Sequence, residues 1–133
     1  MNDQKKPLTI VCVDDDEQMR TLMPVYIRYC LCEREIDLIT GSSRAELTSR
    51  VEQSKPHVII TDNDMEEKDA GVRGIMDIRS KYDTPIILMS GHFNGAREKL
   101  REISEVYYLD KPFKLPKFEE VLRTAYPRLF SPR

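Results

Sequence analysis

Tryptophan is absent from the sequence, and glycine, cysteine and histidine are scarce. The chain has 5 glycines, 3 cysteines and 2 histidines among its 133 residues. An odd and small number of cysteines argues against a disulfide framework, and Cys12 lies in an aliphatic run where a thiol behaves as a small hydrophobe. Cys30 and Cys32 have no second Cys or His pair at ligand spacing, which argues against a structural zinc site. The polar ligands that the sequence does offer are mainly carboxylate oxygens.

The sequence also lacks an excess of basic charge and a long apolar run. The 21 Lys and Arg residues against 23 Asp and Glu give a formal net charge of -2, which provides no general attraction to nucleic acid or to an anionic membrane. No apolar run approaches the roughly 20 residues of a membrane-spanning helix, and the polar start MNDQKKP lacks the core of a signal peptide. We expect a cytoplasmic protein that binds neither nucleic acid nor membrane directly.

What is present is an alternation of short aliphatic runs with stretches of helical periodicity. A chain of 133 residues suits one domain, predicted over 1–133 with a core from about residue 8 to 126 and without an effector domain. Strands are expected at 8–14, 35–41, 57–62, 85–91 and 106–110, and helices at 17–31, 43–53, 71–81, 95–103 and 115–125. Such alternation predicts an α/β fold whose parallel sheet is covered by helices on both faces.

Local signals refine these boundaries. The nearly continuous aliphatic residues of 57–62 and 85–91 favour central strands, whereas 35–41 alternates and is typical of an edge strand. Ser43 followed by Glu46 is a capping-box signature, and Pro116 suits a first helical turn. Pro24 falls inside a predicted helix, where it removes a backbone hydrogen bond, so we expect a kink there or a late helix start.

Three consecutive aspartates, residues 14–16, follow the first predicted strand. Two carboxylates about 4 Å apart repel by roughly 4 kcal/mol at an effective dielectric constant near 20, so a cation is expected beside them. In a doubly wound sheet, ligands gather beyond the carboxyl ends of the strands. This rule brings Asp62, Ser90 and Lys111, at or after the ends of three other strands, to the same place.

The chemistry of this set indicates a site for a metal and a phosphoryl group. Carboxylates without His or Cys partners are typical of a hard cation such as Mg²⁺, and Lys111 with the metal can hold a doubly charged phosphoryl group. Taken alone, the aspartate run is more typical of a solvated helix N-terminus. The combination with Asp62, Ser90 and Lys111 favours the site.

These motifs resemble those of a known family, the receiver domains of bacterial two-component response regulators of the chemotaxis-regulator type. VDDD is similar to the family's acidic pair, PHVIITDNDM to its phosphoacceptor strand, PIILMSG to the strand with the switch hydroxyl, and YLDKPF to its lysine-proline motif. The resemblance covers nearly the whole chain. It implies a flavodoxin-like, five-stranded parallel sheet in the order 2-1-3-4-5.

The resemblance also implies a role for each motif residue. Asp62 would be the phosphoacceptor and a metal ligand, Asp15 a direct Mg²⁺ ligand, Asp14 a ligand through water, and Asp64 a ligand through its backbone carbonyl. Ser90 and Lys111 would bind the phosphoryl group, and Tyr108 would be the aromatic switch, with Tyr107 as the competing tyrosine. The Lys111–Pro112 bond would be cis. Asp64 and His92, each two positions beyond a site residue, are expected to tune dephosphorylation.

The implied function is signalling, not enzymatic turnover. A stand-alone receiver would accept a phosphoryl group from a sensor histidine kinase or phosphotransfer protein and bind a downstream protein through residues 95–125, as a monomer or weak dimer. Two alternatives remain open: a phosphatase or hydrolase with an aspartyl-phosphate intermediate, and an interaction module that works without phosphorylation. Where the family usually has proline after D-x-x-M, this chain has Glu66, and the charges at Glu66, Glu67 and Asp69 are candidates for altered kinase docking.

Overall fold

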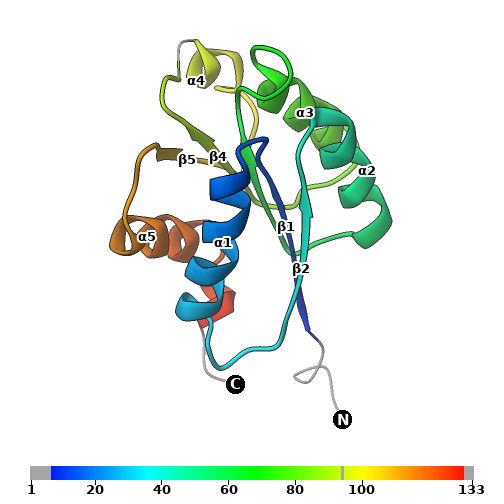
Figure 1. Ribbon diagram of the computed structural model, residues 1–133. Helices are drawn as coiled ribbons and strands as arrows, with labels where there is room; N and C mark the ends of the chain where they lie inside the picture. Colours follow the sequence, from blue (N-terminus) through cyan, green and yellow to red (C-terminus); the bar gives the residue numbers. More distant parts are fainter. Residues whose placement is uncertain (1–6, 94, 131–133) are drawn as a thin grey trace.

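The computed structural model describes residues 7–93 and 95–130, so both ends of the predicted 1–133 domain lie outside the described residues. Five parallel strands form one sheet in the order β2-β1-β3-β4-β5 (Figure 1). The strands are β1 (Leu8–Val13), β2 (Ile36–Gly41), β3 (Val58–Asp62), β4 (Ile86–Ser90) and β5 (Val106–Asp110). The helices are α1 (Glu17–Cys30), α2 (Arg44–Ser54), α3 (Ala70–Arg79), α4 (Ala96–Lys99) and α5 (Leu115–Ala125), followed by the 3-10 helix η2 (Pro127–Phe130).

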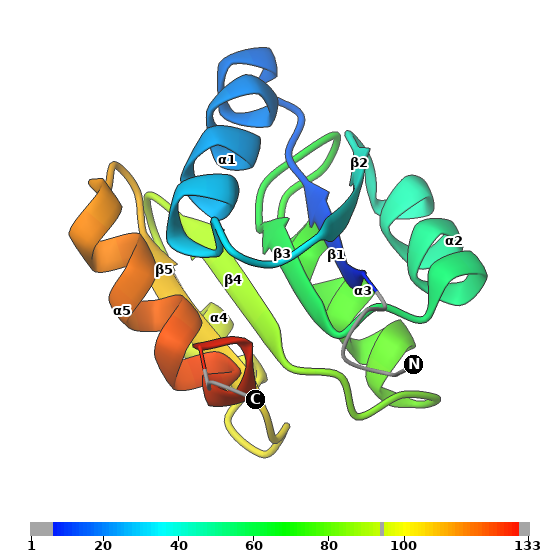
Figure 2. The same cartoon turned by 90° about the horizontal axis from the view of Figure 1, so that it is seen from below.

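The sheet confirms the predicted fold class and strand order. Every residue of β3 and of β4 is buried, as expected for central strands between two helical layers. The strand β2 shows a mixed burial pattern and lies at the edge beside β1. The crossover connections place α1 and α5 on one face of the sheet and α2 and α3 on the other (Figure 2).

Two apolar cores fill the spaces between the sheet and its helices. Because successive strand side chains point to opposite faces, Ile60 packs with α1 and α5 residues such as Phe118, whereas Ile59 packs with Leu47 of α2. Leu129 of η2 is buried in the first core, so the packed structure extends beyond the predicted limit at residue 126. In the part of the chain that the structure describes, no helix is long and apolar enough to cross a membrane.

The helix starts follow the local signals, with one exception. The Ser43 hydroxyl caps α2 by accepting the Glu46 N–H at 3.2 Å, and Pro116 lies in the first turn of α5. The late start considered for the first helix is wrong, because Asp16 caps α1 through the Gln18 N–H and the helix begins at Glu17. Pro24 therefore lies inside α1, and the kink there stays a prediction.

Helix α4 is shorter than predicted. The sequence predicts a helix over 95–103, whereas α4 ends at Lys99, after four residues. Ala96, Leu100 and Ile103 have helical spacing in the sequence, and all three pack into the core on the α2 and α3 face of the sheet. The backbone nevertheless leaves the helical conformation at Leu100 (φ -102°, ψ 9°). A single turn fixes several dihedral angles for few hydrogen bonds, which makes helices of this length weak by themselves.

Candidate functional site

Three carboxylates meet beyond the carboxyl ends of β1 and β3. Carboxylate oxygens of Asp14, Asp15 and Asp62 lie within 4.8 Å of one another. They come together because β1 and β3 are neighbouring parallel strands, so that Asp14, directly after β1, adjoins the end of β3 at Asp62. Asp14 is fully buried and Asp62 is nearly so, whereas Asp15 is exposed. The cluster therefore has a buried floor and one ligand group at its rim.

Lys111 supplies the positive charge that the aspartate cluster requires. Its Nζ lies 2.8 Å from Asp14 Oδ2 and 3.1 Å from Asp62 Oδ1, donating a hydrogen bond to each. Its backbone N–H donates to Ser90 O at 2.9 Å, which ties the segment after β5 to the end of β4. The next peptide bond, Lys111–Pro112, is cis, as the family resemblance implied.

Burial and charge both act on the ionisation of this group of residues. Burial, with a further contribution from Asp14, raises the pKa of Asp62 from 3.8 to about 7, and the Lys111 ammonium opposes the rise. Burial alone would lower the pKa of Lys111, but its contacts with Asp14 and Asp62 outweigh burial and raise it. Lys111 therefore stays an ammonium and, among the described residues, is the cation that hydrogen-bonds to the carboxylates of this cluster. The pocket keeps an excess of negative charge that a further cation would relieve.

The segment after β3 approaches Asp62 closely. The Gly71 N–H donates to Asn63 O at 2.7 Å, and a Cβ at Gly71 would lie 2.5 Å from Asp62 O and 2.7 Å from Asn63 Cα. Only glycine fits this contact without moving backbone atoms. The Asn63 side chain then accepts from the Val72 N–H at 3.2 Å and donates to Asp69 at 3.3 Å. The start of α3 is thereby fixed against Asp62.

Asn63 and Arg20 are contributors that the sequence analysis missed. The sequence signal for Asn63 was its position directly after Asp62. In the structure Asn63 is 2 % exposed, and a buried polar side chain requires hydrogen-bond partners. The Arg20 Nη1 donates to Asp14 O at 2.8 Å. Its signal is weaker, because an arginine in the first turns of a helix is ordinary. Both residues hold the backbone of the site.

The side chain of Asp64 is exposed and turns back onto its own loop. Its Oδ1 accepts the Asp69 N–H at 3.1 Å. This contact involves the side chain alone, so the role of the Asp64 backbone carbonyl as a metal ligand stays a prediction. It also means that an amide at this position keeps the loop contact while the charge is removed.

Ser90 and His92 hydrogen-bond within one loop. The Ser90 hydroxyl donates to His92 O at 2.5 Å and accepts the His92 N–H at 3.0 Å. Ser90 ends β4 and is 2 % exposed, whereas the His92 side chain is exposed. The hydroxyl predicted to bind a phosphoryl group is therefore engaged with backbone atoms in this conformation.

The two tyrosines of β5 face different surroundings. Tyr108 is half-buried and meets Phe93 edge to face, with ring centroids 5.4 Å apart, and the Arg97 guanidinium lies 4.3 Å from the centre of its ring. Tyr107 packs against the core on the other face of the sheet, and its hydroxyl donates to Glu105 at 3.0 Å. Tyr108 is thus the tyrosine beside α4 and the loop of Ser90.

The acidic residues that distinguish the loop after Met65 contact their own domain. The Glu66 carboxylate accepts the Arg44 N–H at 3.2 Å, at the start of α2. Glu67 pairs with Arg44 at 3.4 Å and with Arg73 at 3.1 Å. Exposed pairs of this kind contribute about 0–1 kcal/mol each. The extra charges therefore connect the loop to α2 and α3, and their influence on kinase docking stays a prediction.

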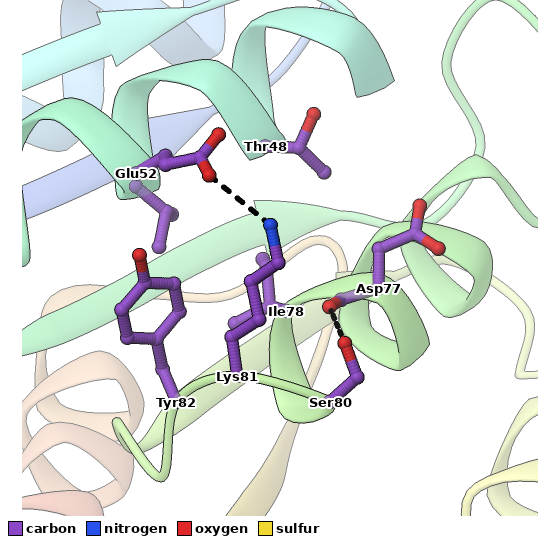
Figure 3. Close-up of a pocket in the computed structure, with 8 residues that line it drawn as sticks. Thr48, Glu52, Asp77, Ile78, Ser80, Lys81 and Tyr82 are labelled. Carbon is purple, nitrogen blue, oxygen red and sulfur yellow. Dashed lines mark hydrogen bonds and ion pairs between the residues drawn. The ribbon is translucent and has the colours of Figure 1, made fainter.

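A separate hollow lies between α2 and α3 (Figure 3). Its volume is about 280 Å³, and Lys81 Nζ meets Glu52 Oε2 across it at 3.1 Å. Ser80 donates to Asp77 O at 2.7 Å, while the Asp77 carboxylate pairs with Arg44. These polar groups already have partners. The chemistry predicted from the sequence is concentrated at the aspartate cluster instead.

Comparison with known proteins agrees with this geometry. A chemotaxis response regulator, CheY4 of Vibrio cholerae, has a similar structure with a TM-score of 0.76, 18% sequence identity, and coverage of 90% of this chain and 99% of that one. The receiver domain of the sensor histidine kinase PA1611 of Pseudomonas aeruginosa PAO1, whose structure holds magnesium in the active site cleft, has a TM-score of 0.74 and 21% sequence identity. The match covers 95% of this chain and 100% of that one. The receiver domain of PhyR from Erythrobacter litoralis has a TM-score of 0.74 and 17% sequence identity, and the match covers 96% of this chain and 95% of that one.

These structural similarities show the fold. No curated protein sequence matched the chain, and the family is shown by a match to a family model. The family model of the response regulator receiver domain matches residues 10–123, a range that includes all three clustered aspartates, Ser90 and Lys111. The chain therefore belongs to the response regulator receiver domains of two-component systems.

Proposed function

We propose that this receiver domain accepts one phosphoryl group on Asp62, with Mg²⁺, from a sensor histidine kinase or a phosphotransfer protein. The observation that supports this most directly is the arrangement of Lys111, whose ammonium contacts both buried carboxylates, Asp62 and Asp14, of the three-aspartate cluster. A nucleophile, a fixed cation and an excess of negative charge suited to a metal are the parts that phosphoryl transfer requires.

The donor set fits magnesium. Three carboxylates without nitrogen or sulfur ligands are typical of a hard cation, and Mg²⁺ prefers a few carboxylates with retained waters. Asp15 and Asp62 would bind it directly, Asp14 through water, and Asp64 through its backbone carbonyl. Bound there, the ion would neutralise charge on the phosphoryl oxygens.

The residues of the chain then divide the work of the transfer. A carboxylate oxygen of Asp62 attacks phosphorus, the new P–O bond forms, and the bond from phosphorus to the donor nitrogen breaks. Lys111 pairs with one phosphoryl oxygen, which requires its ammonium to leave Asp62 while it keeps Asp14. Ser90 gives up its contact with His92 O and donates to another oxygen. In-line attack and fixed positive charge supply the catalysis.

Magnesium dependence tests the proposal. With acetyl phosphate and Mg²⁺, intact-mass measurement is expected to show one added phosphoryl group, and a chelator is expected to abolish it. Asp15→Asn removes a ligand charge and is expected to raise the Mg²⁺ concentration for half-labelling by at least about tenfold. Asp16→Asn is the matched control, because Asp16 caps α1 through its side chain and asparagine caps equally well. Continuous release of phosphate with steady turnover would instead support the phosphatase alternative.

Output would pass through the surface of α4, β5 and α5. A hollow of about 230 Å³ lies on this surface, lined by residues of all three elements, including Arg97, Tyr108 and Val121. Movement of the loop after β4 toward a phosphoryl group would change what Phe93 and Arg97 present beside Tyr108. A downstream protein would read this change, with the domain acting as a monomer or weak dimer.

Asp64 is expected to slow the loss of the phosphoryl group by repelling a water that gains hydroxide character. Asp64→Asn keeps the oxygen that accepts the Asp69 N–H, so it tests the charge alone. We expect dephosphorylation of this variant to be a few times faster, by the roughly 1 kcal/mol of an exposed charge interaction. An unchanged or slower rate of phosphate release would refute the repulsion. His92→Ala, measured in parallel, tests the second tuning residue: we expect a changed rate of phosphate release, because His92 lies directly beside Ser90, and an unchanged rate would remove His92 from the mechanism.

A further inference from the structure

An ion pair connects the loop after the phosphoacceptor strand to α4. Lys99, the last residue of α4, places its Nζ 2.6 Å from Asp69 Oδ2. Asp69 is 8 % exposed, and its other carboxylate oxygen accepts the Asn63 Nδ2 at 3.3 Å. The hydrogen bond from Lys99 lowers the pKa of Asp69, so the carboxylate is charged at neutral pH. The pair thus joins α4 to Asn63, the residue next to Asp62.

Asp69 has a backbone conformation in which its carboxylate contacts Asn63 and Lys99 and does not cap α3. An aspartate at the N-cap of a helix ordinarily caps it with its carboxylate, and Asp69 occupies that position before α3. Its backbone is instead left-handed (φ 61°, ψ 24°), a strained conformation for a residue with a side chain. The carboxylate contacts Asn63 and Lys99 in place of the helix start. The loop therefore gives up a cap to hold α4.

Helix α4 depends on such contacts because it is a single turn. Its buried anchors are Ala96 within the helix and Leu100 directly after it. Besides these anchors, the described residues show Arg97 over the rings of Phe93 and Tyr108, and Lys99 paired with Asp69. Figure 1 shows α4 at the same end of the molecule as the loop that leads into α3.

We propose that the Asp69–Lys99 pair is a clasp that restrains α4 in the unphosphorylated conformation and so sets how readily the domain switches. This inference rests on the proposed function. The clasp is present together with Ser90 bonded to its own loop. If a phosphoryl group on Asp62 recruits Ser90, the segment of His92 and Phe93 moves and draws α4 with it, while Asp69 stays fixed by Asn63. A contact made in one conformation alone shifts the equilibrium toward it.

The test uses Lys99→Gln, Asp69→Asn and the double variant in the full chain. Arg101→Gln is the matched control, because it removes the same charge near the same helix while Arg101 pairs locally with the exposed Glu98. The first measurement is amide hydrogen exchange without Mg²⁺ or phosphodonor. Lys99→Gln is expected to raise the exchange rates of the Lys99 and Leu100 amides, which close the turn of α4 onto Gly95 and Ala96, by about two- to fivefold.

The second measurement is titration with beryllofluoride in the presence of Mg²⁺, followed by NMR. Lys99→Gln is expected to lower the half-saturating concentration by about two- to fivefold. Asp69→Asn is expected to do the same, and the double variant no more than either single variant, since both remove one interaction. Arg101→Gln should behave as wild type.

The outcomes separate the clasp from the function on which it rests. A wild-type protein that does not respond to beryllofluoride overturns the proposed function and the switching role together, whatever the exchange rates. A wild-type response with unchanged half-saturation in Lys99→Gln, or with effects of the single variants that add in the double variant, overturns the clasp and leaves the function intact. Exchange rates that rise equally in Arg101→Gln would assign the effect to net charge and overturn the clasp as well.

Discussion

Asp62→Asn is expected to abolish phosphoryl labelling by acetyl phosphate, while wild type takes up one group per chain. Asp62 ends a fully buried strand, and its carboxylate is 3.1 Å from the Lys111 ammonium that would receive a phosphoryl oxygen. The amide of asparagine is a poor nucleophile and forms no acyl phosphate under these conditions. Loss of a nucleophile removes the reaction, so we expect no residual labelling at Asp62. Intact-mass measurement, followed by peptide mapping, decides this.

Neighbouring acids provide the controls for this assignment. Asp64→Asn alters an exposed carboxylate two positions away that is bound to its own loop, and it is still expected to take up one phosphoryl group at Asp62, which it then loses a few times faster than wild type. Asp14 is fully buried against Lys111, so it is a less accessible rival than Asp64. Full labelling of Asp62→Asn, or a phosphoryl group mapped to another residue in wild type, would show that the assignment is wrong.

The free energy of unfolding of the metal-free protein is expected to fall as the pH rises, because the buried carboxyl of Asp62 then has to ionise. Burial raises the pKa of Asp62 to about 7, from 3.8 for an ordinary aspartate. Between these values the folded state keeps a proton that the unfolded state has released, so the free energy of unfolding falls as the pH rises through this window. The stability contribution is fully present below about 3.8 and is lost above about 7. At about 1.4 kcal/mol per pH unit, the loss is on the order of 4 kcal/mol.

Comparison of wild type with Asp62→Asn isolates this contribution from the other titrating groups. Urea unfolding in the presence of chelator, at several pH values from 4 to 8, should show Asp62→Asn gaining stability relative to wild type as the pH rises. Added Mg²⁺ should remove most of the difference above pH 7 by stabilising the ionised wild-type cluster. A difference that is constant with pH would show that Asp62 titrates normally in the folded protein.

The sequence determined a large part of this protein by itself. The aliphatic runs of β3 and β4 predicted central strands, because a strand buried on both faces has no need of polar residues. The rule that ligands bind beyond the carboxyl ends of parallel strands then brought Asp14, Asp62 and Lys111 together, as the structure confirms. The Ser43 cap of α2 could also be predicted, because the cap and its partner Glu46 are three positions apart and form a local sequence pattern.

Other features depended on contacts between residues that are distant in the chain. The periodicity of Ala96, Leu100 and Ile103 indicated a long helix, but packing into the second core holds these residues with one helical turn. Asp69 was recognisable as an extra charge, yet its burial, its left-handed backbone and its pairing with Lys99, 30 positions away, depend on the loop before α3 lying against the end of α4.

The difference between the two sets of features is physical. Burial pattern and capping are fixed by residues within a few positions, so a single sequence records them. Which side chain of a charged loop finds which partner is decided by small differences between exposed and buried contacts, each worth about 1 kcal/mol or less when exposed. Those differences exist only once the sheet and its helices have placed the loops side by side.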